Sequence, residues 1–138
     1  MKDSPLALAV QIQKALAHPA RLRILAMLRG GELCVCQITA VLGLAPSTVS
    51  AHLKELRNAG LTVERKEGKW VNIGLADDDE TGGILTLVLS RLAADPLVIA
   101  DNRLVAELRT IPVETLCRVG LEPARDRTMI DTQGRTGA

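Results

Sequence analysis

The sequence has almost no aromatic residues. Its 138 residues include one Trp and neither Tyr nor Phe, although 47% of them are hydrophobic. The core must therefore be built from Leu, Val, Ile and Ala, a composition that suits helices. The length is sufficient for one domain with a modest core.

Signals for a membrane or an extracellular location are also missing. No apolar run approaches the roughly 20 residues that cross a bilayer, and the N-terminus lacks the basic and then apolar pattern of a secretion signal. Three cysteines do not indicate a disulfide framework. We therefore expect a cytoplasmic protein without a membrane partner, whose thiols are reduced and available for a soft ligand or for redox chemistry.

The order of the predicted elements is that of a DNA-binding fold. Apolar residues at helical spacing, bounded by Pro, Gly or capping residues, predict helices. These helices run from Pro5 to Leu16, from Pro19 to about Leu28, from Val35 to Leu42, from Pro46 to Ala59, from Ile84 to Asp95, from about Asp101 to Leu108, and briefly after Pro112. Residues 61–75 alternate around a turn at Glu67 and Gly68, which predicts a two-stranded hairpin. The sequence thus predicts a mainly α protein with a small β-hairpin, a winged helix-turn-helix.

The predicted boundaries follow from this order. Residues 1–95 are expected to form the winged helix-turn-helix domain for DNA binding and dimerisation, and residues 96–120 a C-terminal helical extension that carries Cys117. Residues 121–138 are polar and poor in apolar side chains, so a flexible tail is expected there.

The predicted helix at 84–95 is apolar almost all round, with Arg91 as its only charge before Asp95. A small domain cannot easily bury such a helix on every side, so we expect a homodimer. The contact would involve the first helix together with Ile84, Leu85, Val88 and Leu92.

The predicted helix from Pro46 to Ala59 has one apolar and one polar face. The net charge of the chain is only +1, so a DNA-binding surface would have to be local, and residues 46–70 contain five basic and three acidic side chains. Small hydroxyl side chains at the start of a helix can approach base edges in the major groove, and basic side chains can bind phosphates. The candidate DNA contacts are Ser47, Thr48, Ser50, His52, Lys54, Arg57, Arg65, Lys66 and Lys69.

Several stretches between residues 14 and 75 resemble the ArsR/SmtB family of metal-sensing repressors. They are "HPARLRIL", "STVSAHLKELRNAGL" and "KEGKW", and "ELCVC" at 32–36 is similar to the thiolate motif of the arsenic-responsive branch. The resemblance implies a homodimer that binds an operator palindrome and is released by its inducer, trivalent arsenic or antimony, without an organic cofactor. One departure is Ala45, where family members usually have Ser. Ala is a poor N-cap, although Pro46 can preset the first turn.

Cys34 and Cys36 are the first candidate metal ligands. In a regular helix, residues two apart point about 200° away from each other, whereas in an extended segment they lie on the same side. Ion capture should therefore hold this stretch out of helical geometry and tilt the DNA-reading helix off the groove. Thiolates select soft ions. A trivalent metalloid accepts three sulfurs, and Cys117 is the only further protein thiol. Cys117 would complete the set, or would pack as a buried Cys while a small thiol or hydroxide serves as third ligand.

Other functions fit parts of the sequence. A phosphatase-like arsenate reductase needs Arg six positions after its Cys, but these positions hold Ala40, Leu42 and Pro123. No glycine-rich phosphate loop or hydrolytic triad is apparent either, so the chain is not predicted to be an enzyme. A thiol-redox-sensing repressor of the same fold, or a sensor of another soft metal ion, stays open as an alternative.

Overall fold

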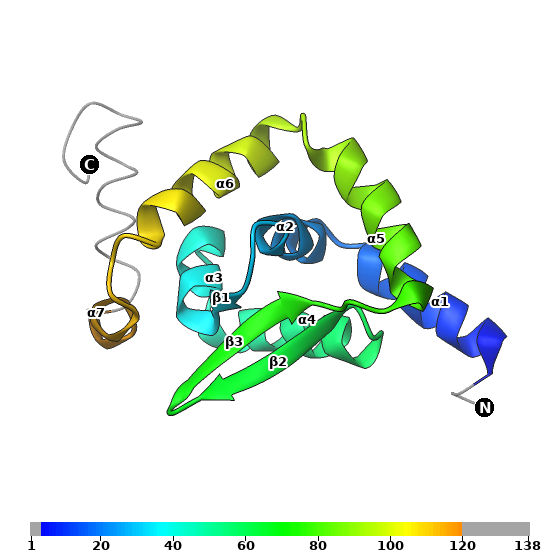
Figure 1. Ribbon diagram of the computed structural model, residues 1–138, viewed down its shortest axis with the longest axis horizontal. Helices are drawn as coiled ribbons and strands as arrows, with labels where there is room; N and C mark the ends of the chain where they lie inside the picture. Colours follow the sequence, from blue (N-terminus) through cyan, green and yellow to red (C-terminus); the bar gives the residue numbers. More distant parts are fainter. Residues whose placement is uncertain (1–3, 120–138) are drawn as a thin grey trace.

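The computed structural model describes residues 4–119, which form seven helices and a three-stranded antiparallel sheet (Figure 1). In chain order the elements are α1 (Pro5–Leu16), α2 (Pro19–Leu28), β1 (Leu33–Cys34), α3 (Val35–Leu42), α4 (Pro46–Asn58), β2 (Thr62–Glu67), β3 (Trp70–Leu75), α5 (Asp79–Leu92), α6 (Pro96–Leu108) and α7 (Val113–Val119). The predicted mainly α protein with a hairpin is confirmed. The stretch 121–138, predicted to be a flexible tail, lies outside the described residues.

Capping residues explain where the helices begin. The Ser4 hydroxyl accepts a hydrogen bond from the backbone N–H of Ala7 (3.1 Å), and His18 Nδ1 accepts one from a backbone N–H in the first turn of α2 (3.0 Å). Both caps are followed by proline at the start of the helix, as predicted. Ala45 makes no side-chain hydrogen bond as the N-cap of α4. Of the predicted start signals, only Pro46 at the first helical position is present.

Two helices begin earlier than predicted. α5 starts within the predicted polar connector, because Asp78 Oδ1 accepts a hydrogen bond from the backbone N–H of Thr81 (2.9 Å). α6 starts directly at Pro96 and not near Asp101, because Asp95 accepts hydrogen bonds from two N–H groups of the first turn (2.9 and 3.2 Å). In both places an aspartate satisfies N–H groups that have no partner inside the helix.

The sheet contains a strand that the sequence pattern did not indicate. β1 pairs with β3, which in turn pairs with β2, and all pairs are antiparallel. Leu33 lies opposite Ile73, and Cys34 lies opposite Asn72. A strand of two residues has no alternation to detect. Its pairing places the first cysteine in the same sheet as the hairpin.

One apolar core joins all layers of the molecule. α2 lies at its centre, with α5 and α6 arching over it on one side and the sheet on the other (Figure 1). Ile24 of α2, Leu108 of α6 and Leu116 of α7 are at most 1% exposed in this core. No single helix in the described residues is long and apolar enough to cross a membrane; α5 and α6 meet the length and composition limits only as a pair bent by 101°.

A bidentate ion pair fixes α6 on α2. Arg23 donates from Nε and Nη2 to the two carboxylate oxygens of Asp101, at 2.8 and 2.9 Å, and Asp101 is only 5% exposed. These hydrogen bonds raise the pKa of Arg23. Removing one partner of a buried pair leaves an uncompensated charge, which is strongly unfavourable. The pair therefore holds α6, and with it the segment that leads to α7, in place.

Apolar side chains of α1 and α5 are exposed on the single subunit. Leu6 of α1 is 76% exposed and Leu87 of α5 is 58% exposed. This distribution is consistent with the predicted dimer contact but requires one correction. Leu85, assigned to the contact from the sequence, is 4% exposed and packs inside the subunit's own core, so Leu87 is the more outward apolar side chain of this helix.

Candidate DNA interface and cysteine site

α4 separates its two faces as predicted. Val49, Leu53 and Leu56 are buried against the core. Because the helix is held by this face, its start and its other face point to solvent. The exposed candidates on it are Ser47, Thr48, Ser50, Lys54 and Arg57. The hairpin of β2 and β3 extends beside α4 and carries the exposed Arg65, Lys66 and Lys69 (Figure 1).

Both candidate arginines form ion pairs within the subunit. Arg57 Nη1 donates to Glu64 Oε2 at 2.9 Å, which ties α4 to β2. Arg65 binds Glu32 at 2.8 Å. No ion pair is seen between Lys66 and another residue of the range 4–119, so among the hairpin cations Lys66 is better placed than Arg65 to bind a phosphate directly.

His52 lies at the junction of α4 and α2. Its ring centroid is 4.4 Å from that of His18, and Arg21 Nη1 lies 3.3 Å from His52 Nδ1. A guanidinium can only donate, so Nδ1 accepts and the ring is neutral in this contact. Burial, and then the neighbouring His18 and Arg21, lower the pKa of His52. His52 thus acts as a packing residue that joins the two helices, in addition to its predicted place near DNA.

This arrangement predicts a pH dependence of stability. Because the folded-state pKa of His52 lies below the usual value, the unfolded chain binds a proton first as the pH falls. The free energy of unfolding should therefore decrease as the pH drops through the window between the two pKa values, and level off below it. Melting temperatures measured from about pH 7.5 to 5 should show a steeper loss for the wild type than for His52→Gln. Equal losses in both proteins would contradict this role of His52.

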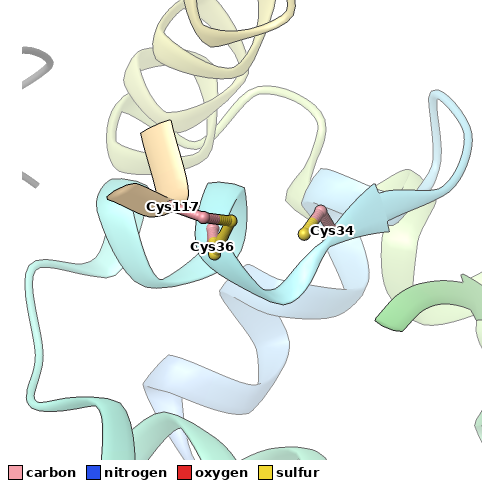
Figure 2. Close-up of side chains that lie close together, drawn as sticks. All are labelled: Cys34, Cys36 and Cys117. Atoms are coloured by element: carbon pink, nitrogen blue, oxygen red, sulfur yellow. A yellow bond between two sulfur atoms is a disulfide. The ribbon is translucent and has the colours of Figure 1, made fainter. Parts of the chain in front are cut away.

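Three cysteine sulfurs come together beside α3 (Figure 2). Cys34 ends β1, Cys36 lies in the first turn of α3, and Cys117 lies on α7. All three sulfurs lie within 4.8 Å of one another. The site therefore joins residues 81 positions apart in sequence within one subunit. Cys34 is buried, and the other two are half-buried.

The expectation of three reduced thiols is corrected by the structure. Cys36 and Cys117 form a disulfide, with their Cα atoms 5.6 Å apart, and Cys34 is free (Figure 2). The physical reason is the docking of α7 on α3, where the buried Leu116 anchors the short helix. This docking brings the two Cα atoms into the range that a disulfide requires. Sequence spacing alone could not give that distance.

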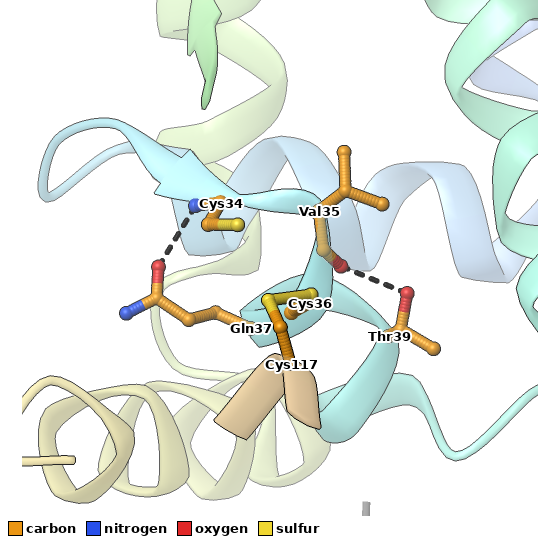
Figure 3. The surroundings of a disulfide bond; sticks show 6 residues. All are labelled: Cys34, Val35, Cys36, Gln37, Thr39 and Cys117. Atoms are coloured by element: carbon orange, nitrogen blue, oxygen red, sulfur yellow. Dashed lines mark hydrogen bonds between the residues drawn. A yellow bond between two sulfur atoms is a disulfide. The ribbon is translucent and has the colours of Figure 1, made fainter. Parts of the chain in front are cut away.

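The start of α3 explains how Cys34 and Cys36 face the same point. Helix α3 begins between them, so Cys34 is the N-cap with extended backbone and only Cys36 is helical. The backbone N–H of Cys34 donates to Gln37 Oε1 at 2.8 Å, and Thr39 Oγ1 donates to the Val35 carbonyl at 2.8 Å (Figure 3). The predicted reshaping of this stretch by ion capture stays a prediction. In the structure only Cys34 of the two is extended, and the sulfurs converge with α3 intact.

Gln37 is a site residue that the sequence interpretation missed. It is 7% exposed and fixes the backbone of Cys34. A signal was available, because a capping residue followed three positions later by Gln is the pattern of a capping box. Here Cys takes the place of the usual Ser or Thr.

The chemistry of this cluster favours a soft, thiophilic ion. Within the described residues the group contains sulfur ligands alone, without His, Asp or Glu. Three sulfurs match the trigonal set of a trivalent metalloid, whereas structural zinc is almost always four-coordinate. The disulfide must first accept two electrons and two protons, giving two thiols, before Cys36 and Cys117 can serve as ligands.

The sequence matches a known family of regulators. A family model described as "Bacterial regulatory protein, arsR family" matches residues 18–62. The chain is 43% identical over 70 residues to the arsenical resistance operon repressor of Escherichia coli, a match that covers 50% of this chain and 60% of that protein. It is 41% identical over 107 residues to the HTH-type transcriptional regulator CmtR of Mycobacterium tuberculosis, covering 78% of this chain and 85% of that one. A homolog of the cadmium resistance regulatory protein CadC from Staphylococcus aureus is 38% identical over 78 residues, covering 56% and 64%.

The structure is similar to that of a homodimeric winged helix-turn-helix DNA-binding domain from Mycobacterium bovis, described as a possible ArsR-family regulator. The TM-score is 0.57 at 32% identity, and the match covers 62% of this chain and 79% of that one. The predicted winged helix-turn-helix is thereby confirmed. These relatives are transcription regulators, which also confirms the prediction of a regulator rather than an enzyme.

Proposed function

Because the chain belongs to the ArsR family of bacterial regulatory proteins, we propose that it is a repressor released from DNA by a trivalent metalloid. A homodimer binds operator DNA through α4 and the hairpin, and arsenic or antimony binds Cys34, Cys36 and Cys117 and lowers the affinity for the operator. The observation that carries this proposal is the convergence of three sulfurs within 4.8 Å beside α3. The E. coli relative is named for arsenical resistance and covers half of this chain.

The position of the cysteine site supports a coupling to DNA binding. α3 is the first helix of the helix-turn-helix and packs against α4, the DNA-reading helix. An ion that binds both Cys34 and Cys36 acts on the first turn of α3, and Cys117 adds α7 to the same ion. A ligand can shift an equilibrium only through different affinities for the two states. The three ligands come from β1, α3 and α7. If DNA binding moves these elements relative to one another, the DNA-bound and the free protein bind the ion with different affinities.

The test is a titration of the operator complex. Reduced protein on a labelled operator duplex is titrated anaerobically with arsenite, antimonite, zinc and cadmium. Release by arsenite and antimonite at lower concentrations than by zinc or cadmium supports the metalloid function. Release by cadmium alone would assign the site to a soft divalent ion, in line with the cadmium resistance relative. Retention of the operator in all four titrations would overturn the metal-responsive function.

The disulfide favours a second candidate, a thiol-redox-sensing repressor. In this case two thiols, Cys36 and Cys117, lose two electrons and two protons to an oxidant and form the S–S bond that the structure contains. Cys34 takes no part in that bond. Release of a Cys34→Ser variant by a peroxide would therefore support redox sensing, whereas metalloid release requires Cys34.

Operator binding should depend on Lys66. We expect Lys66→Ala to weaken binding by several-fold and to lower the slope of log affinity against log salt by about one, because one phosphate contact and its released counterion are lost. Fluorescence anisotropy over a salt series measures both. Arg103→Ala is the control, because this exposed residue lies on α6, outside both the predicted DNA-binding face and the predicted dimer contact. An unchanged slope in Lys66→Ala would move the phosphate contacts away from the hairpin.

A further inference from the structure

Glu32 reaches across the sheet to the hairpin. It directly precedes β1, and its carboxylate accepts hydrogen bonds from Arg65 of β2: Nη2 donates to Oε1 at 2.8 Å, and Nε lies 3.1 and 3.2 Å from the two oxygens. β3 lies between these strands. The absence of a side chain at Gly74 of β3 gives Glu32 its path, since a Cβ there would lie 3.3 Å from Glu32 Cγ.

Two exposed carboxylates, those of Glu32 and Glu67, lie close to the Arg65 guanidinium. Glu67 Oε1 lies 3.7 Å from Arg65 Nη2 and also accepts a hydrogen bond from Asn72 Nδ2 at 3.2 Å. The hydrogen bonds from Arg65 lower the pKa of Glu32, and the same hydrogen bonds raise the pKa of Arg65. Two carboxylates thus neutralise a guanidinium that the sequence assigned to DNA phosphate. The same N–H groups of Arg65 bind either a carboxylate or a phosphate, because both anions use the forked geometry of the guanidinium.

Cys34, one of the proposed ligands, ends the short strand β1 that Glu32 directly precedes. Cys34 is two residues after Glu32 and lies opposite Asn72 of β3, and Asn72 in turn lies opposite Arg65 of β2. A shift of β1 that moves the Cys34 sulfur therefore also moves Glu32 relative to Arg65. In the structure the three cysteine sulfurs lie close together and, at the same time, Glu32 forms an ion pair with Arg65.

We propose that Glu32 competes with operator phosphate for Arg65, and that ion capture by the cysteines strengthens this competition. This inference rests on the proposed metalloid function and assigns the regulation of that site to a named residue. When the cysteines hold an ion, β1 is fixed where Glu32 binds Arg65, and the hairpin loses a phosphate contact. When the operator is bound, Arg65 turns to the phosphate and Glu32 is displaced. Glu32 is thus a positioning residue that acts on DNA through Arg65.

The test compares Glu32→Gln with the wild type in the full-length reduced protein. Operator Kd is measured with and without saturating arsenite, and the ratio of the two values is the release factor. Loss of the charge should tighten binding without arsenite by about two- to five-fold, the effect of an exposed ion pair. Binding with arsenite should tighten by a larger factor, because the proposed competition is stronger when the cysteines hold an ion, and the release factor should therefore shrink. In an Arg65→Gln background the Glu32→Gln change should have no further effect, because the partner is already absent.

Glu64→Gln is the matched control. It removes the same charge from the same sheet and breaks the pair with Arg57, but Glu64 lies on β2 and not on the segment that carries Glu32 and Cys34. It should tighten operator binding and leave the release factor unchanged. Unchanged affinity of Glu32→Gln without arsenite would overturn the competition, and an unchanged release factor would overturn the link to the cysteines. If arsenite fails to release the wild type, the metalloid function fails, whereas the affinity comparison still decides the competition for Arg65.

Discussion

Replacing Cys34 with Ser should abolish release of the operator by arsenite while leaving operator binding intact. Cys34 is the N-cap of α3, and its backbone N–H donates to Gln37 Oε1 at 2.8 Å. Ser is a preferred N-cap and completes a capping box with Gln37, so α3 should remain formed. The variant loses one of three sulfurs. We expect metalloid affinity to fall by at least about 100-fold, because even partners behind the ligands are worth about 10- to 100-fold.

The same measurement on Cys36→Ser and Cys117→Ser separates the roles of the sulfurs. Cys36→Ser should also abolish release, and Cys117→Ser should weaken metalloid affinity and remove one sulfur from the X-ray absorption shell. Operator affinity without arsenite is the control for folding in all three variants. If arsenite released the Cys34→Ser variant from the operator as readily as it releases the wild type, Cys34 would not be a ligand. Three sulfurs around arsenic in Cys117→Ser, with no thiol in the buffer, would remove Cys117 from it.

Features that depend on the residue pattern within a single helix or hairpin could be predicted from the sequence. The buried face of α4 and the hairpin follow from apolar periodicity. α3 ends at Gly43 in the left-handed conformation, as its sequence suggested. The starts of α5 and α6 also had local signals, since Asp78 and Asp95 are capping residues that the prediction did not use.

The contacts that join distant elements could not be predicted in this way. The Cys36–Cys117 disulfide depends on how α7 docks on α3, and the ion pair of Glu32 with Arg65 depends on the pairing of β1 with β3. Neither leaves a periodic trace in the sequence. The role proposed for Cys117 came from counting thiols against the three ligands of a trivalent metalloid, and it stays a prediction until the cysteine variants are measured.

Replacing Leu87 with Asp should dissociate the homodimer and, with it, the operator complex. Leu87 is 58% exposed on α5, so the change leaves the subunit core untouched, whereas Leu85 and Leu89 are each 4% exposed and would report folding instead. Burying a Leu contributes about 1.5–3 kcal/mol, and a two-fold interface contains each residue twice. Because only the exposed 58% of Leu87 can be newly buried in the contact, losing both copies removes about 1.7–3.5 kcal/mol and should weaken the dimer by roughly 20- to 400-fold, and a buried aspartate would add to this.

Analytical ultracentrifugation of Leu87→Asp measures the dimer directly, and circular dichroism checks that the subunit remains folded. The matched control is Ile99→Asp, which introduces the same charge at another exposed apolar side chain (37%), on α6 and not among the residues assigned to the contact of α1 with α5. We expect this control to remain a dimer that binds the operator, because only the α1–α5 surface is assigned to the partner. Operator affinity should fall together with the dimer in Leu87→Asp, since a palindrome is bound through two half-sites about one helical turn apart, roughly 10 base pairs. A folded Leu87→Asp protein that remains dimeric at micromolar concentration would refute the contact, and dissociation of both variants would extend it onto α6.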